Sequence, residues 1–267
     1  MTDKKFAVLG DPIDHSMSPA IHLSAYKVLG LDWGYEKVQV HSGGLNEFVA
    51  HQGAHFQGFS VTMPLKAEAA ALAANADPLV QRLGIANTLI RTASGLNAFN
   101  TDVFGITKAL EDCWVTNPQR VAILGAGATA RSAILALHVK APSSHVSVYV
   151  RSSSNTSEIT DLAKTLDLDI YVQSLSDFSD SQDLTINTIP GKHSVTSSDK
   201  QSGWLLDVNY SNPDKTLNEL FDTLKVVSGK DMLLWQAIAQ IRLFIALDAS
   251  KELPNEVDVL RAMSATL

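Results

Sequence analysis

The chain has 267 residues, 45% of them hydrophobic, and a formal net charge of −7 with an isoelectric point near 5.6. This length can bury a substantial core and leaves room for two domains. The acidic balance argues against nucleic acid or an anionic membrane as a partner, because both select clustered lysine and arginine. The single cysteine excludes an internal disulfide and a cysteine-based metal site, and it suits a reducing compartment.

The amino terminus is a short charged lead into a predicted strand and lacks the pattern of a signal peptide. Uninterrupted apolar runs of about 18 residues are also lacking. We therefore expect a cytoplasmic protein without a membrane partner. The eight histidines do not have the spacing of a metal site, so no metal is expected.

Strand and helix patterns alternate along the first hundred residues. Predicted strands lie at residues 5–9, 35–40, 59–62, 87–91 and 96–99, the last two as a hairpin around Ser94 and Gly95. Predicted helices lie at residues 18–29, 45–51, 64–74 and 102–112. Ser18 suits the N-cap of the first helix, and Pro64 suits the first turn of the third.

Several polar residues fall where these strands end. The hydroxyls of Ser16 and Ser18 are two residues apart before a helix, where both can donate to a carboxylate, although Ser18 can equally serve only as a cap. Lys66 is predicted in the first turn of a helix, where the helix dipole disfavours a cation. With partial desolvation this would lower the pKa of the lysine, as proton transfer requires, whereas the alternative is a surface lysine.

The segment from Asn87 to Asp102 offers further polar groups at strand ends. Asn87, Asn100 and Thr101 carry amide and hydroxyl groups, and Asp102 begins a predicted helix, where a carboxylate stays ionised or simply caps the helix. Paired across a cleft with Lys66, Asp102 would form a cation and anion that can exchange a proton with a substrate hydroxyl.

The stretch VAILGAGATAR, residues 121–131, predicts a buried parallel strand, a glycine-rich turn and a helix. Its pattern is G-x-G-x-x-A, in which Gly125 makes the tight turn, Gly127 lets a pyrophosphate approach the backbone, and Ala130 lets the helix pack on the strand. A strong apolar helix at residues 130–139 and a strand at 146–150 complete a βαβ unit. An ordinary strand-to-helix turn is the alternative.

The end of the second strand bears on the choice of dinucleotide. NAD-binding folds usually place an acidic residue there for the ribose 2′-hydroxyl, but this strand ends in Arg151 followed by three serines. The first carboxylate, Glu158, is predicted to lie too far into the next helix. A guanidinium with flanking hydroxyls suits a 2′-phosphate, so NADP is favoured over NAD, with a solvated surface charge as the alternative for Arg151.

The rest of the chain predicts further strands near residues 184, 205–208 and 225–227, a buried helix at 232–248, and a terminal helix from an Asn255 cap to Met263. If the last helices pack on the first hundred residues, residues 1–102 and 230–267 form one α/β domain that binds substrate. Residues 103–229 then form an inserted, Rossmann-like dinucleotide-binding domain, with the cleft between the two.

Together these motifs resemble the shikimate dehydrogenase family over essentially the whole chain. The matching motifs, in family order, are G-x-P-I-x-H-S-x-S-P (residues 10–19), S-V-T-x-P-x-K (60–66), A-N-T (86–88), N-T-D (100–102), G-A-G (125–127), NTIPG (187–191), DVNY (207–210) and GKDMLLWQA (229–237). The resemblance implies NADPH-dependent, reversible reduction of 3-dehydroshikimate to shikimate, in the pathway to chorismate and the aromatic amino acids.

The resemblance also implies roles for individual residues. The catalytic pair falls on Lys66 and Asp102. The substrate positions are Ser16, Ser18, Thr62, Asn87, Tyr210 and Gln236, and the cofactor positions are Gly125, Gly127, Ala128, Arg151, Thr188 and Gly229. Departures from the usual family residues include Ser60, Ala98, Ala128, Val150 and Asn209, none of which removes a catalytic group.

Two other functions remain open at this point. One is an NAD-preferring quinate/shikimate dehydrogenase, which Arg151 disfavours. The other is a catalytically silent protein that senses NADP or shikimate, which retention of Lys66 and Asp102 disfavours, because a binding protein has little use for a proton-transfer pair. In each case the expected partner is a small molecule, with the chain as a monomer or homodimer.

Overall fold

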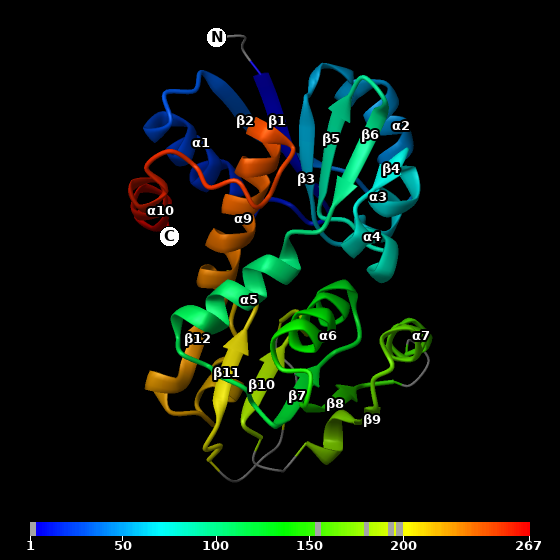
Figure 1. The fold of residues 1–267 in the computed structure, drawn as a ribbon, viewed down its shortest axis with the longest axis vertical. Helices are drawn as coiled ribbons and strands as arrows, with labels where there is room; N and C mark the ends of the chain where they lie inside the picture. The colour runs from blue at the N-terminus through cyan, green and yellow to red at the C-terminus, as the bar shows by residue number, and fades with distance from the viewer. Residues whose placement is uncertain (1–3, 153–155, 179–181, 192–194, 196–199) are drawn as a thin grey trace. The chain divides into compact units, whose positions relative to one another are not determined.

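The computed structural model describes residues 4–152, 156–178, 182–191, 195 and 200–267. The chain divides into two compact units, one formed by Met1–Thr101 with Gln236–Leu267 and the other by Asp102–Trp235. We call them unit 1 and unit 2, and Figure 1 shows their helices and strands. Both units are α/β, as the alternation of strand and helix patterns predicts.

Unit 1 is built on a mixed sheet with the strand order β2-β1-β3-β5-β6-β4 in the described part of the chain. The strands are β1 (Lys4–Gly10), β2 (Trp33–Gln39), β3 (Gly58–Val61), β4 (Asn75–Ala76), β5 (Thr88–Thr92) and β6 (Gly95–Phe99). Strand β1 pairs in parallel with β2 and β3, and β5 pairs antiparallel with β3. The predicted β5–β6 hairpin is confirmed, whereas β4, which only pairs at the sheet edge, was not predicted.

Helices cover both faces of this sheet. They are α1 (Ser18–Val28), α2 (Leu45–Ala50), η1 (Gln52–His55), α3 (Lys66–Leu72), α4 (Pro78–Leu83), the end of α9 (Gly229–Ala246), and α10 (Glu256–Ser264). Side chains alternate along β1: Ala7 and Leu9 pack in one cluster with residues of α2 and α3, whereas the ring of Phe6 stacks on Phe244 of α9 with centroids 4.3 Å apart.

Two expectations for the helix ends of unit 1 are wrong. The N-cap of α1 is Met17, and Ser18 is its first residue. Helix α3 begins at Lys66 with Leu65 as its cap, so Pro64 precedes the first turn. Helix α4 was not predicted, although Asp77 caps it by accepting the Val80 N–H at 2.7 Å.

Unit 2 is built on an all-parallel sheet with the order β12-β11-β10-β7-β8-β9 among its described residues. The strands are β7 (Arg120–Leu124), β8 (His145–Val150), β9 (Ile170–Ser174), β10 (Leu184–Asn187), β11 (Trp204–Asp207) and β12 (Val226–Ser228). The order reverses between β7 and β10, as in doubly wound dinucleotide-binding folds. The edge strand β9 was not predicted.

The helices of unit 2 are α5 (Asp102–Asp112), α6 (Ala128–Lys140), α7 (Ser157–Leu166), α8 (Lys215–Asn218), the beginning of α9, and the short η3 (Leu175–Asp177) and η4 (Thr223–Lys225). Helix α5 packs against α6. Ala122 and Leu124 of β7 pack with Leu205, Leu217 and Phe221 in a core on one face of the sheet. The sheet therefore has the buried central strands expected of a parallel architecture.

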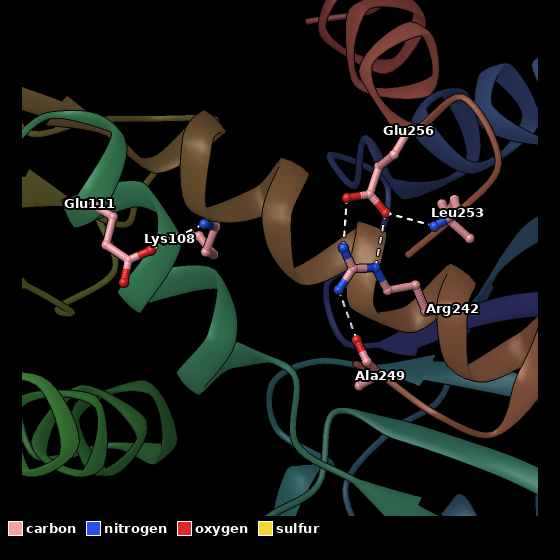
Figure 2. A network of polar contacts seen from close by, with 6 residues as sticks. All are labelled: Lys108, Glu111, Arg242, Ala249, Leu253 and Glu256. Carbon is pink, nitrogen blue, oxygen red and sulfur yellow. Dashed lines mark hydrogen bonds and ion pairs between the residues drawn. The ribbon is translucent and has the colours of Figure 1, made fainter. Parts of the chain in front are cut away.

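A buried ion pair joins the last two helices of unit 1 (Figure 2). The Arg242 guanidinium of α9 contacts both carboxylate oxygens of Glu256 on α10, with Nη2–Oε1 at 2.6 Å and Nε–Oε2 at 2.9 Å. Arg242 Nη1 also donates to the Ala249 carbonyl oxygen, and the Leu253 N–H donates to Glu256. The two charged side chains are only 6% and 15% exposed, so each depends on the other for solvation.

We predict that Glu256→Gln lowers the free energy of unfolding by about 3 kcal/mol, because it removes the carboxylate that pairs with the buried Arg242 guanidinium. The matched control is Asp258→Asn on the same helix, whose ion pair with Arg261 is 59% and 72% exposed. That change should cost less than about 1 kcal/mol. Urea unfolding of the two variants tests the contrast, and equal losses would contradict it.

Candidate functional site

The carboxyl ends of β1 and β3 place several predicted site residues at one edge of the unit 1 sheet. The Thr62 N–H donates to the Leu9 carbonyl at 2.8 Å, and the Asp11 N–H donates to the Met63 carbonyl at 3.0 Å. The Ala86 N–H donates to the Lys66 carbonyl at 2.9 Å. We call this group the unit 1 edge, and its predicted site residues are Ser16, Ser18, Thr62, Lys66 and Asn87.

The two serines of the unit 1 edge adjoin each other. Ser16 and Ser18 are 8% and 7% exposed, and the Ser18 N–H lies 3.4 Å from Ser16 Oγ. The Ser16 N–H in turn donates to the Ile13 carbonyl and closes a tight loop. Since Ser18 does not cap α1 with its side chain, capping does not explain why a hydroxyl stands at this position.

The two predicted catalytic residues each begin a helix. Lys66 is half-buried at the start of α3 in unit 1. Asp102 is 4% exposed at the start of α5 in unit 2, directly after Thr101, the last residue of the first segment of unit 1. A carboxylate in the first turn of a helix is stabilised by the helix dipole.

A chain of buried hydrogen bonds ends at Asn87. The Tyr35 hydroxyl donates to Ser60 Oγ at 2.5 Å, and Ser60 donates to Gln240 Oε1 at 2.7 Å. Gln240 Nε2 donates to the Asn87 carbonyl oxygen at 3.1 Å and to Thr88 Oγ1 at 3.0 Å. Thr88 then donates to Asn87 Oδ1 at 3.0 Å. We call these residues the Tyr35–Asn87 relay.

Contacts with Thr101 determine which way the Asn87 amide points. The backbone N–H of Thr101 donates to Asn87 Oδ1 at 2.9 Å, and a backbone N–H has no acceptor role. Asn87 Nδ2 consequently lies on the other side and donates to Thr101 Oγ1 at 2.8 Å. The orientation of an amide that carries a predicted substrate contact is therefore set by buried neighbours.

Sequence reasoning missed Tyr35, Thr88 and Gln240 as members of this relay. The one available signal was spacing: Gln240 lies one turn after the predicted substrate residue Gln236, so both lie on the same face of α9. Gln236 is 8% exposed and Gln240 is 1% exposed.

The aromatic cluster beside the relay is uncharged. The ring of His22 stacks on Tyr35 with centroids 4.1 Å apart. Burial lowers the pKa of His22 to about 3, against a smaller opposing effect of Gln240. Burial also raises the pKa of Tyr26, so near neutral pH both side chains are uncharged. The relay thus begins in a low-dielectric environment, which strengthens its hydrogen bonds.

Unit 2 contains a pocket of about 620 Å³ where the strand order reverses. It is lined by Gly125, Ala126, Gly127, Val150, Arg151, Ser152, Ser157, Glu158, Thr188, Ile189 and Pro190. These residues follow the carboxyl ends of β7, β8 and β10, which is where open α/β sheets bind ligands. We call it the switch-point pocket.

The two glycines of this pocket have different surroundings. Gly125 has φ +102°, and a Cβ there would lie 2.7 Å from Thr188 Oγ1, which itself donates to the Leu124 carbonyl. Gly127 is the N-cap of α6 with φ −80°, and a Cβ there would meet nothing within 4 Å. Gly125 is thus required by the turn, whereas Gly127 leaves open space beside the helix N-terminus.

The structure places the remaining predicted cofactor and substrate residues as follows. Arg151 and Thr188 line the switch-point pocket, and Ala128 is the first residue of α6. Gly229 does not line it; a Cβ there would lie 2.5 Å from the Asp207 carbonyl oxygen, so packing explains this glycine. Tyr210 is half-buried after β11. Ser153 and Ser154, two of the hydroxyls that flank Arg151, lie outside the described residues.

The expectation that Glu158 lies too far along its helix is wrong. Helix α7 begins at Ser157, so Glu158 is in its first turn, and its side chain lines the same pocket as Arg151. Glu158 Oε2 lies 3.2 Å from Nη2 of Arg131 on α6.

Two kinds of feature are lacking among the described residues. Within them, no group of three or more histidine, cysteine, aspartate or glutamate side chains is arranged to hold a metal ion. The helices they form do not include one long and apolar enough to cross a membrane.

The chain combines a doubly wound unit that has a glycine-lined pocket with a second α/β unit that has polar residues at the unit 1 edge. This is the architecture of a dinucleotide-dependent oxidoreductase. A family model for the shikimate dehydrogenase substrate binding domain matches residues 8–89. The shikimate dehydrogenase (NADP(+)) of Methanosarcina acetivorans is 32% identical over 280 residues, which cover 97% of this chain and 99% of that protein. The chain therefore belongs to the shikimate dehydrogenase family.

Solved structures agree over the whole chain. Shikimate dehydrogenase of Mycobacterium tuberculosis is similar with a TM-score of 0.79 and 29% identity, covering 98% of this chain and 99% of that one. Shikimate 5-dehydrogenase of Thermus thermophilus, solved in complex with NADP(H) and shikimate, has a TM-score of 0.79 and 27% identity, covering 99% and 100%. The two-domain α/β fold expected from the sequence is confirmed.

We predict that Gly125→Ala lowers the free energy of unfolding by about 2 kcal/mol or more, because the new methyl group meets Thr188 at a positive φ. Gly127→Ala should cost less than about 1 kcal/mol, since it adds a methyl group to open space and changes only the N-cap. Denaturant unfolding of both variants without ligand measures the difference. A Gly127→Ala loss as large as that of Gly125→Ala would contradict the assignment.

Proposed function

We propose that this chain catalyses the reversible, NADPH-dependent reduction of 3-dehydroshikimate to shikimate, a step toward chorismate and the aromatic amino acids. The observation that carries the proposal is that both halves of the chemistry are present in one chain of this family. The unit 1 edge has hydroxyl, amide and ammonium groups, and unit 2 has a glycine-lined pocket with a guanidinium. Residues 1–102 with 230–267 form the substrate domain of this proposal, and 103–229 form its NADP domain, in a cytoplasmic monomer or homodimer.

The unit 1 edge is suited to a small polyhydroxylated carboxylate. Ser16 and Ser18 adjoin each other in a closed loop and would donate to the substrate carboxylate. Thr62, Asn87 and Gln236 would hold the ring hydroxyls, with Tyr210 as a further contact. Asn87 supports this role most strongly, because its buried hydrogen bonds with Thr101 hold its amide in one orientation before any substrate arrives.

The switch-point pocket is suited to a dinucleotide that carries a 2′-phosphate. The open space beside Gly127 lets a pyrophosphate approach the N-terminus of α6, where backbone N–H groups and the helix dipole favour an anion. Arg151 is exposed in the same pocket and would pair with the 2′-phosphate.

The reduction needs a hydride at the carbonyl carbon and a proton at the forming alkoxide. The nicotinamide supplies the hydride when NADPH is bound. Lys66 is the proposed donor of the proton or the stabiliser of the alkoxide charge. Asp102 is proposed to orient the lysine and to accept a hydrogen bond from the neighbouring substrate hydroxyl. In the reverse direction Lys66 takes the proton from the shikimate hydroxyl.

The proposal predicts which substrates the purified protein oxidises. Absorbance at 340 nm, recorded with shikimate or quinate and with NADP or NAD, gives four combinations on one sample. We expect activity with shikimate and NADP. Activity mainly with NAD or quinate would favour the quinate/shikimate dehydrogenase alternative. The Glu158 carboxylate in the pocket is the observation that supports this alternative. Binding of both ligands without turnover would instead favour a sensing protein.

We predict that Lys66→Ala lowers turnover by about two to four orders of magnitude, as loss of a general acid does, while the protein folds and binds NADP. Lys215→Ala is the matched control, because Lys215 also begins a helix but is exposed on α8 of unit 2. Steady-state kinetics and titration with NADP separate turnover from binding. Near-normal turnover of Lys66→Ala would remove this lysine from the mechanism.

A further inference from the structure

We propose that Arg131 determines the coenzyme preference of this chain by neutralising Glu158, so that the switch-point pocket accepts a 2′-phosphate. Arg131 does not line the pocket and acts only through the carboxylate that does. The inference deepens the proposed function and rests on it, since it concerns how NADP is distinguished from NAD.

The pocket contains two opposing signals. Arg151 and Glu158 are the charged side chains among its described lining residues. A carboxylate beside the adenosine ribose of a bound dinucleotide accepts the 2′-hydroxyl of NAD and repels a 2′-phosphate, and Glu158 lines the pocket proposed to hold that ribose. A free Glu158 would therefore counteract Arg151.

The ion pair with Arg131 resolves this conflict. Nη2 of Arg131 lies 3.2 Å from Oε2 of Glu158, and the two side chains are 10% and 59% exposed. The Arg131 side chain is therefore mostly buried within the unit, whereas Glu158 is largely exposed and lines the pocket. Burial lowers the pKa of Arg131 and Glu158 opposes that shift, but an arginine remains charged in proteins. A partly buried guanidinium attracts the carboxylate more strongly than an exposed one would, which favours the paired state of Glu158.

The summed charge of three side chains predicts whether each substitution strengthens or weakens binding of a 2′-phosphate. Arg151, Arg131 and Glu158 sum to +1. Arg131→Gln brings the sum to zero, Glu158→Gln raises it to +2, and the double variant returns it to +1. The affinity for a ligand with a doubly charged 2′-phosphate should rise with this sum. The affinity for a ligand with a 2′-hydroxyl should change little.

The experiment is isothermal titration of the full chain with NADP and NAD, and with adenosine 2′,5′-bisphosphate and adenosine 5′-monophosphate as fragments. We expect Arg131→Gln to weaken binding of the two 2′-phosphorylated ligands by about tenfold, with the other two within about threefold of wild type. Glu158→Gln should tighten 2′-phosphate binding by about threefold or more. The double variant should lie within about threefold of wild type.

Asp161→Asn is the matched control, because it removes a negative charge from the same helix at a residue that does not line the pocket. Its preference for the 2′-phosphate should equal that of wild type. A double variant as weak as Arg131→Gln would overturn the inference, since the effect of Arg131 would then bypass Glu158. If Arg131→Gln does not fold, Glu158→Gln decides: weaker 2′-phosphate binding overturns the inference, and tighter binding supports it.

Failure of the proposed function gives a different result. A wild-type chain that binds adenosine 2′,5′-bisphosphate no more tightly than adenosine 5′-monophosphate contradicts NADP linkage itself. A wild-type chain that prefers the 2′-phosphate, with a preference that none of the substitutions changes, leaves the function in place and removes only the role of Arg131 and Glu158.

Discussion

Parallel pairing of strands that are distant in sequence is the constraint on which both candidate sites depend. In unit 1, β1 pairs with β3, so the loop with Ser16 and Ser18 lies at the same edge as the loop with Thr62 and Lys66. In unit 2, β7 pairs with β10, so the turn at Gly125 meets Thr188. Each parallel pairing places the carboxyl ends of its two strands side by side, so polar residues that directly follow the two strands lie close together. The chemistry of the protein is therefore a consequence of strand order.

The parts of the fold that could be predicted are those with a strong local signal. The glycine-rich turn after β7 and the hairpin β5–β6 follow from short patterns of apolar and turn residues. Strand β9 was missed although Ile170, Tyr171 and Val172 favour a strand, because none of its five residues is fully buried and it has no clear apolar alternation. Helix α4 was missed although Asp77-Pro78 and Gly84 mark its ends, because only six residues separate them.

The site was less predictable than the fold, because long-range polar contacts leave little trace in a sequence. The ion pairs between Arg131 and Glu158 and between Arg242 and Glu256 link different helices, whereas those between Lys164 and Asp161 and between Arg261 and Asp258 follow i, i+3 spacing and can be read locally. The better-buried pairs are the ones without a local signal. Reasoning from position alone placed Glu158 outside a pocket that it lines.

The direction of the Tyr35–Asn87 relay limits how this protein can vary. Each member donates to the next, from the phenol of Tyr35 through Ser60, Gln240 and Thr88 to the Asn87 amide. No member can exchange donor for acceptor unless its neighbours do the same, because a buried polar group without a partner is costly. Substitutions at these positions are therefore coupled, so relatives that differ at position 60 should carry compensating changes at 35 or 240.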